Sequence, residues 1–436
     1  MVGRGRKRKG QRGRGPGRLR HAKTSGLNPG VSGKKYSADV PGGKVVEVSG
    51  PPALRDAMVA ALRARGGEID RLTHRMHTYP ARLHPDAAKI LLEQLPGETV
   101  LDPFCGGGTV LVEAMAAGRV VYGRDLNPVA VLVARARTRL FDQRAQKRVY
   151  DQGRKVIAGA RAIVEGEEPI ALPAAVEYVQ DWFSPHALAE LGALDAAIRT
   201  VPGLTGDILR VAHSSLVVKF SHRASDTSPR REERKVKRGT VLRAFEGRLQ
   251  EMAKMHDALQ RAVPAGVPPA DVSWADAREL DVEADVLCTS PPYPGTYDYL
   301  PQQHLRLSWL RTEDDREDLD DAVAREIGGR RAFRQSIAQG YGRWERATAE
   351  WMGAAARKLR RDGYLAIVIG DGVSGGRLLR TREPTERAAR QGGLRRVGVC
   401  SIERVDPGIR AAKHEHILVF QKSAKRTRIV GRAEDA

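Results

Sequence analysis

Apolar residues recur at helical spacing in several separate parts of the chain. The segment PALRDAMVAALRARGG (52–67) repeats apolar positions three and four residues apart and ends in two glycines, which predicts a helix. A second helix is predicted over HPDAAKILLEQLPGE (84–98), which Pro-Gly closes. A longer apolar stripe at 240–263 predicts a helix packed against the domain, with an oligomer interface as the alternative.

Between these helices the pattern changes to short apolar runs. The segment 99–140 predicts the order strand (Thr99–Leu101), glycine turn, helix (Val110–Ala117), strand (Val120–Gly123), turn and helix (Val129–Leu140). Later runs predict further strands at DVSWADA (271–277), ADVLCT (284–289), GYLAIVIGDG (363–372), LRRVGVC (394–400) and KHEHILVFQK (413–422). Strands that alternate with helices are typical of a parallel α/β sheet.

The same pattern divides the chain into five segments. Residues 1–45 are rich in Gly, Arg and Lys and predict a disordered basic tail, with a simple solvated tail as the alternative. The α/β domain is predicted in two parts, 46–142 and 271–424, separated by a helical insertion at 143–270. Residues 425–436 form a short C-terminal tail.

Charge and cysteine content narrow the function classes. The chain has 74 Lys and Arg against 53 Asp and Glu, a net charge of +21, which favours a polyanionic partner such as a nucleic acid. Three widely spaced cysteines without a CxxC pair exclude a disulfide framework and suit a reducing cytosol. No apolar run reaches the roughly 18 residues of a membrane span, so a cytoplasmic protein is predicted.

The turn DPFCGGGT follows a predicted strand and opens a predicted helix. Three consecutive glycines, Gly106 to Gly108, permit a tight turn and a close approach of backbone to a ligand. Asp125 ends the next strand, where a carboxylate can accept hydrogen bonds from ribose hydroxyls. The pair indicates a nucleoside cofactor without distinguishing a nicotinamide from S-adenosylmethionine, and a turn without a ligand is the alternative.

A second turn, TSPPY, follows the predicted strand 284–289. An exocyclic amine of a nucleobase is a poor nucleophile, because its lone pair is conjugated into the ring. Two acceptors for its N–H groups would favour a pyramidal nitrogen, and Ser290 Oγ and the Pro291 carbonyl, stiffened by Pro292, are candidates. The Tyr293 ring offers a face on which a flipped-out base can stack.

Together, DPFCGGGT and TSPPY resemble the S-adenosylmethionine-dependent, amino-methylating DNA methyltransferases, and the Ser-Pro-Pro-Tyr form is typical of those that modify cytosine N4. The resemblance covers roughly residues 74–142 and 272–422. It implies a class I methyltransferase (Rossmann-like) fold, with a mostly parallel seven-stranded sheet and a final antiparallel hairpin. It makes residues 46–142 the cofactor half and residues 271–424 the catalytic half.

The resemblance also implies roles for individual residues. The methionine side of the cofactor would be lined by Asp102, Phe104, Cys105, Gly106 and Gly108. Asp125 would bind the ribose and Asp276 the adenine amine. The segment HTYPARLHP (77–85) resembles the one that closes over the cofactor, with Tyr79, Pro80 and Arg82 as its contacts.

The location of target recognition stays open. The helical insertion precedes the adenine-binding aspartate, whereas in this family the recognition region usually follows that motif or the catalytic one. The basic stretch 221–239 is a candidate DNA contact or lid, with a solvated loop as the equal alternative. Tyr297 and Tyr299 are candidates to line a base pocket, and His304 and Arg306 to touch phosphate; a loop followed by a packed helix is the alternative.

Other reactive residue types receive structural interpretations. Cys105 and Cys288 are predicted as buried residues, because no Pro-Cys pair of the kind used by cytosine-C5 methyltransferases occurs. No metal is predicted. The histidine group at residues 74, 77 and 84, and the pair His414 and His416, lack acidic or thiolate partners at ligand spacing.

These observations predict an enzyme that transfers a methyl group from S-adenosylmethionine to cytosine N4 in double-stranded DNA, after base flipping and by direct displacement. Amino-methylation of tRNA or rRNA, and adenine-N6 methylation of DNA, are the alternatives within the same chemistry. A non-catalytic nucleic-acid-binding protein is the alternative from another class. The sequence indicates no partner nuclease.

Overall fold

The computed structural model describes residues 43–64, 71–80, 82–166, 169–226, 228–310, 316–404 and 412–423. The predicted C-terminal tail and all but the last three residues of the predicted N-terminal tail therefore lie outside the described residues. No helix in the described part of the chain combines the length and apolarity that a membrane crossing requires.

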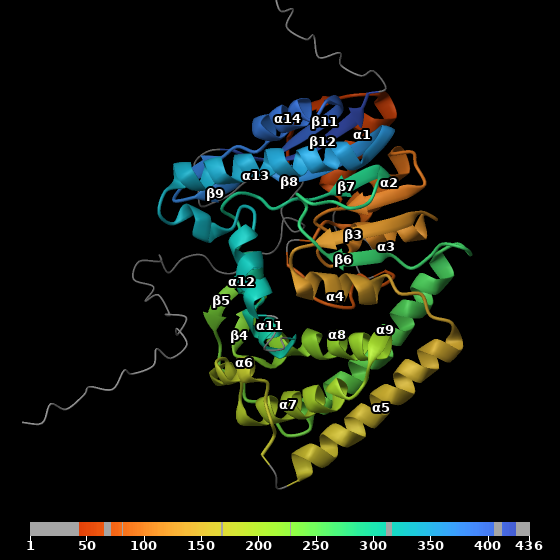
Figure 1. Ribbon diagram of the computed structural model, residues 1–436, viewed down its shortest axis with the longest axis vertical. Coiled ribbons are helices and arrows are strands. Elements are labelled where there is room, and N and C mark those ends of the chain that lie inside the picture. The colour runs from red at the N-terminus through yellow and green to blue at the C-terminus, as the bar shows by residue number, and fades with distance from the viewer. Residues whose placement is uncertain are drawn as a thin grey trace, which may run out of the picture. The chain divides into compact units, whose positions relative to one another are not determined.

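One eight-stranded sheet organises the α/β part of the molecule (Figure 1). Its order is β1-β11-β12-β8-β7-β2-β3-β6. The strands are β1 (Val45–Ser49), β2 (Thr99–Asp102), β3 (Val120–Asp125), β6 (Asp271–Trp274), β7 (Ala284–Thr289), β8 (Leu359–Gly370), β11 (Leu394–Arg404) and β12 (Lys413–Lys422). Each strand predicted from an apolar run is present.

The strand directions confirm the predicted fold class. Strands β6, β3, β2, β7 and β8 pair in parallel, and β12 pairs antiparallel with both β8 and β11. These seven strands form the mostly parallel sheet of the class I methyltransferase fold, with its terminal hairpin. β1 adds an eighth strand, which the prediction lacks, antiparallel to β11 at the edge.

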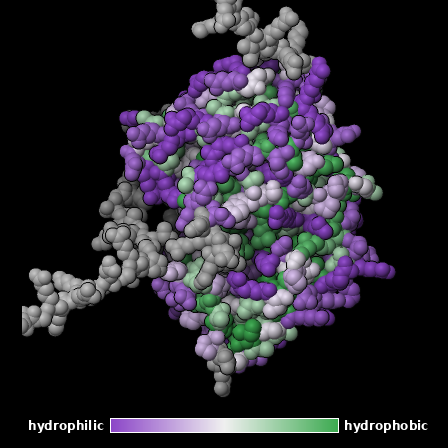
Figure 2. Space-filling model, in the orientation of Figure 1, coloured by the Kyte–Doolittle hydropathy of each residue, from purple (hydrophilic) through white to green (hydrophobic). Residues whose placement is uncertain are grey.

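Alternating residues of the central strands bury opposite faces of the sheet. Val100 and Val286 pack with α1 (Pro52–Arg63), α2 (Pro85–Gln94) and α3 (Thr109–Ala116) in one apolar cluster. Their neighbours Leu101 and Leu287 pack on the other side with α13 (Ile337–Lys358) and α14 (Arg382–Gln391). Both faces are therefore covered, as parallel strands require, and hydrophilic side chains cover much of the outer surface over α13 and α14 (Figure 2).

The insertion forms a helical block with an apolar cluster of its own. Its main helices are α5 (Gln143–Glu165), α7 (Pro185–Arg199), α8 (Gly203–Phe220) and α9 (Thr240–Ala262), with the short α6 (Ala174–Glu177). Residues such as Leu191, Leu209 and Phe245 are fully buried within it. Helix α4 (Pro128–Arg137) lies between β6 and α8 and joins the block to the sheet (Figure 1).

Candidate active site at the carboxyl ends of the strands

The glycine turn and the Ser-Pro-Pro-Tyr turn lie side by side. They follow β2 and β7, which are neighbours in parallel, so both turns leave the same edge of the sheet. Thr289 Oγ1 donates a hydrogen bond of 2.6 Å to Asp102 Oδ1, which ties the two turns directly together. The strand order also reverses beside β2, and ligands of open α/β sheets bind at such a point.

Two left-handed glycines shape the first turn. Gly106 has φ +49° and Gly108 has φ +80°, where a side chain would be strained. Gly106 N donates to Asp125 Oδ2 and Asn127 N donates to Asp125 Oδ1, both at 2.8 Å. Each oxygen of Asp125 keeps further lone pairs, so the carboxylate can accept hydroxyl groups as well.

Tyr79 covers this turn, as the segment 77–85 was expected to do. Its ring is buried, and a Cβ placed on Gly106 would lie 3.2 Å from the ring edge. Asn127 Nδ2 donates to the Tyr79 hydroxyl at 3.3 Å. Arg137 of α4, fully buried, donates to the carbonyls of Gly107 and His77, so it clamps the Tyr79 segment onto the glycine turn.

Burial raises the pKa of both acids near this turn. The pKa of Asp102 rises to about 7, although hydrogen bonds from Thr289 and Phe104 oppose the effect. The pKa of Asp125 rises to about 6, against the hydrogen bonds from Asn127 and Gly106. Within the described residues, both hydrogen bonds to Asp102 go to Oδ1, which leaves Oδ2 as an available acceptor.

Phe104 and Cys105 turn away from this acceptor group. The Phe104 ring packs edge-on against Trp351 of α13, with 5.2 Å between centroids. Cys105 Sγ is buried where a Cβ on Gly123 of β3 would lie 3.2 Å from it. Burial raises the pKa of Cys105 and of Cys288, so neither thiol has the character of a nucleophile.

Asp276 follows β6 and lies beside Asp125, since Ala275 N donates to the Asp125 carbonyl. Arg278 donates to both oxygens of Asp276, and Arg325 Nε lies 3.0 Å from Oδ2. Although burial acts in the opposite direction, these guanidinium groups hold the pKa of Asp276 below its usual value. In this arrangement its acceptor positions are taken, so an adenine amine would have to displace an arginine.

The second turn is held from outside by α13. Trp344 Nε1 donates to the Pro292 carbonyl at 3.2 Å, and Gly295 N donates to the carbonyl of Gly328. Within the part of the chain that the structure describes, the Pro291 carbonyl has no hydrogen-bond partner. Ser290 is half-buried. Of the two acceptors predicted for a target amine, the Pro291 carbonyl therefore has no protein donor there, and Ser290 lies beside the Tyr293 hydroxyl.

Tyr293 contacts both Ser290 and Glu415. The Tyr293 hydroxyl donates to Glu415 Oε1 of β12 at 3.5 Å. Burial raises the pKa of Tyr293, the charge of Glu415 adds to this, and a hydrogen bond with the Ser290 side chain acts in the opposite direction. The Tyr293 hydroxyl therefore interacts with both Ser290 and Glu415.

The site contains residues that the sequence did not single out. Thr289 joins the turns, and Asn127 joins Tyr79 to the loop after β3. Glu326 Oε1 accepts from the backbone of Tyr299 and Leu300, and burial together with the nearby Asp298 raises the pKa of Glu326 to about 7. Their roles depend on contacts between residues more than 25 positions apart in the sequence, and no local sequence pattern marks them.

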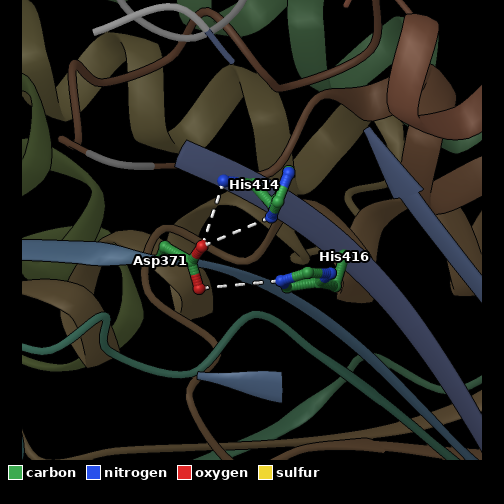
Figure 3. A group of neighbouring side chains, drawn as sticks. All are labelled: Asp371, His414 and His416. Atoms are coloured by element: carbon green, nitrogen blue, oxygen red, sulfur yellow. Dashed lines mark hydrogen bonds and ion pairs between the residues drawn. The ribbon is translucent and has the colours of Figure 1, made fainter. Parts of the chain in front are cut away.

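His414 and His416 do have an acidic neighbour, contrary to the prediction. Asp371 follows β8 and faces both rings (Figure 3), with His414 Nδ1 at 3.8 Å and His416 Nε2 at 3.7 Å from its oxygens. However, Arg380 Nη1 lies 2.8 Å from both Asp371 Oδ2 and His414 Nδ1. A guanidinium therefore already supplies the positive charge of this cluster.

The first histidine group and the candidate phosphate contacts have structural partners. His74 bonds to Glu113 of α3, and His77 bonds to Ser214 of α8 at 3.1 Å. Arg306 is 1% exposed and pairs with Asp226, so it cannot touch phosphate as predicted. The alternative of a loop followed by a packed helix describes α11 (His304–Leu310), in which Leu305, Leu307 and Trp309 are buried.

Part of the chain is similar to known methyltransferases. Residues 73–167 match the family described as "UPF0020: RMKL-like, methyltransferase domain". The chain is 46% identical over 72 residues to the type II methyltransferase M.MvaI of Kocuria varians, and 30% identical over 84 residues to M.MjaII of Methanocaldococcus jannaschii. These stretches are 15% and 19% of this chain, and each is 16% of the relative.

Solved structures resemble the chain only distantly. TrmN from Thermus thermophilus has a TM-score of 0.29 at 13% sequence identity. The aligned region is 78% of this chain and 49% of the TrmN chain. The rRNA methyltransferase AviRa from Streptomyces viridochromogenes has a TM-score of 0.30 at 12% sequence identity. The aligned region is 79% of this chain and 88% of the AviRa chain. At these values the likeness does not bear on substrate or mechanism.

The glycine turn fits S-adenosylmethionine, the cofactor of methyltransferases of this fold. Asp125 offers acceptors for two ribose hydroxyls, and Gly106 leaves room beneath the Tyr79 ring that a Cβ would fill. Asp102 Oδ2 offers a further acceptor beside the turn.

Proposed function

We propose that this chain transfers a methyl group from S-adenosylmethionine to the N4 amine of cytosine in double-stranded DNA, after the base has been flipped out. The single observation that carries the proposal is the 2.6 Å hydrogen bond from Thr289 to Asp102, because it holds the cofactor turn and the amine-binding turn at one edge. The two curated relatives are type II methyltransferases, which supports DNA as the substrate.

The residues of the second turn would prepare the amine. Ser290 Oγ and the Pro291 carbonyl accept its two N–H groups, which favours a pyramidal nitrogen with its lone pair directed outward. Pro291 and Pro292 carry no N–H that could compete for these acceptors. The cofactor, when bound, supplies an electrophilic methyl group, and the amine proton leaves after the transfer, so no strongly basic side chain is required.

Tyr293 would have two tasks. Its ring rests against β8, where a Cβ on Gly370 would lie 2.7 Å from Tyr293 Cε2, so it forms a fixed platform for the extruded base. Its hydroxyl is the proposed acceptor of a hydrogen bond from Ser290, which would keep the serine lone pairs directed at the amine. Tyr293→Phe should therefore retain DNA binding but lower turnover.

Transfer of tritiated methyl groups tests the proposal. Purified protein is incubated with duplex DNA, tRNA or rRNA, and the products are digested to nucleosides and identified by mass spectrometry. We expect N4-methylcytosine from duplex DNA. Detection of N6-methyladenine would change the target base from cytosine to adenine, and a methylated RNA nucleoside would change the substrate from DNA to RNA. Cofactor binding without transfer to any substrate would favour a nucleic-acid-binding protein.

A further inference from the structure

A basic hairpin lies next to the helix that follows the catalytic turn. Strands β4 (Arg223–Ser225) and β5 (Ser228–Arg231) leave the end of α8 (Figure 1) and lead into the loop 232–239. Residues 228–238 contain six Lys or Arg and two Glu. Five of these cations are exposed: Arg230, Arg231, Lys235, Lys237 and Arg238. The sequence alone did not distinguish a DNA contact from a solvated loop here.

Buried polar contacts fix this hairpin to the helices after the catalytic turn. Arg306 of α11 forms an ion pair with Asp226, and the side chains are 1% and 8% exposed. Arg223 Nη1 donates to the carbonyl of Gln302 at the end of α10 (Tyr299–Gln302). Because breaking a buried ion pair leaves an uncompensated charge in the interior, this contact holds the hairpin against α11.

The same contacts reach the cofactor side of the site. Arg306 Nε donates to the Ser214 carbonyl of α8 at 3.1 Å. Ser214 Oγ bonds to His77, two residues before the Tyr79 that covers the glycine turn. One network therefore connects the hairpin with the segment that covers the glycine turn and with the helices that follow the Ser-Pro-Pro-Tyr turn.

The hairpin also borders a cavity of about 480 Å³. Arg231 lies over the Trp182 ring, 5.6 Å from its centroid, and Arg234 donates to the last carbonyls of α8. These two arginines therefore shape the cavity wall. Lys235 lines the same cavity, and neither its side chain nor that of Lys237 has a hydrogen bond or ion pair among the described residues. The lysines remain available to an external anion.

We propose that the hairpin surface 228–238 binds the phosphate backbone of duplex DNA beside the flipped base. This inference rests on the proposed function, since it assigns the substrate's backbone to a surface of the same enzyme. Lysines without acidic partners give sequence-independent affinity and fix the register of the duplex, while base identity is read elsewhere. The Arg306–Asp226 pair would keep that register aligned with the catalytic turn.

Salt-dependent binding of the full-length chain tests the surface. Lys235→Gln/Lys237→Gln is compared with the matched pair Arg154→Gln/Lys155→Gln, which removes the same charge from exposed positions on α5. The probe is a short fluorescent duplex of mixed sequence, with tRNA in a parallel arm. Because each phosphate contact contributes about 0.9 to the slope of log K against log salt, the hairpin pair should lower the slope by about 1.8.

The possible outcomes separate this inference from the proposed function. The inference is supported if the double variant Lys235→Gln/Lys237→Gln binds the duplex more weakly, keeps normal affinity for S-adenosylmethionine, and the α5 double variant binds the duplex as the wild type does. Equal slopes of log K against log salt in the two double variants overturn the inference and leave the methyltransferase proposal intact. Weakened tRNA binding with unaltered duplex binding overturns the DNA assignment, and a wild-type chain that binds no nucleic acid overturns both proposals.

Discussion

The two turns of the site are built from opposite backbone chemistry. The turn after β2 uses glycines, whose freedom at positive φ lets an amide N–H point at Asp125. The turn after β7 uses prolines, which remove donors and leave a stiff row of carbonyls. The first turn positions donors around a carboxylate, and the second presents acceptors. The difference indicates that one is suited to hold the cofactor and the other to hold an amine.

One helix braces both turns with a tryptophan each. Trp344 of α13 bonds to the Pro292 carbonyl, and Trp351, two helical turns later, packs on Phe104 beside the glycine turn. Damage to one turn should therefore alter amine transfer with cofactor affinity preserved, and damage to the other should do the reverse. Each prediction below tests that division.

Removing the acceptor of the second turn should have the largest effect. In Ser290→Ala we expect methyl transfer to fall by about 10²–10³-fold, since a positioned hydrogen-bonding group contributes this much to the reaction rate. Affinity for S-adenosylmethionine, measured by calorimetry, should stay within about twofold, because among the described residues no hydrogen bond joins Ser290 to the glycine turn. Unchanged turnover would remove Ser290 from the mechanism.

Filling the first turn should act on the cofactor instead. Gly106→Ala places a methyl group at φ +49° and 3.2 Å from the Tyr79 ring. Left-handed backbone strain costs about 1–2 kcal/mol, and the Kd for S-adenosylmethionine should rise by about 5–30-fold. Gly118→Ala is the control, because its φ is +81° but it lies at the other end of α3. If both variants bind the cofactor normally, the glycine turn is not the site.

The pH dependence of cofactor binding should report the acid of the first turn. Because burial raises the pKa of Asp125 to about 6, its carboxylate is protonated below that pH and loses acceptors for ribose hydroxyls. Affinity should fall by about tenfold per unit below pH 6, under the range in which Asp102, with a pKa of about 7, titrates. Asp125→Asn should bind weakly without this dependence; a wild-type affinity that does not change between about pH 5 and 8 would contradict the assignment.

The two tryptophans offer the smallest and most direct comparison. Trp344→Phe removes the hydrogen bond to Pro292, and a net loss of about 1 kcal/mol should lower turnover about fivefold. Trp351→Phe should weaken cofactor binding by a similar factor at near-normal turnover. The two substitutions are matched in chemistry and lie on one helix, so identical kinetic effects would show that α13 stabilises the domain without separating the turns.

Local features of the site were predictable, whereas its long-range contacts were not. DPFCGGGT and TSPPY could be assigned to strand ends because apolar runs and turn residues are local signals. That Thr289 bonds to Asp102 follows only from β7 pairing with β2, 187 residues away in sequence. The acidic neighbour of His414 was missed for the same reason, since Asp371 lies 43 residues earlier.

The prediction was wrong for Arg306, a charged residue that is buried. Arg306 was expected at the surface because arginine is usually exposed, yet Asp226, from the basic stretch 221–239, pairs with it inside the protein. Strand β1 was missed because five residues with alternating burial at one edge give a weak signal. Both features depend on partners from distant parts of the chain.

The pairing of β1 with β11 constrains the order in which the protein can be completed. Val48 lies opposite Cys400, so the first strand must wait until nearly the whole chain has left the ribosome. During this interval β1 has no partner, and an unpaired strand is a template for association with other chains. Until β11 is made, this short segment near the start of the chain is therefore a site at which nascent chains can associate.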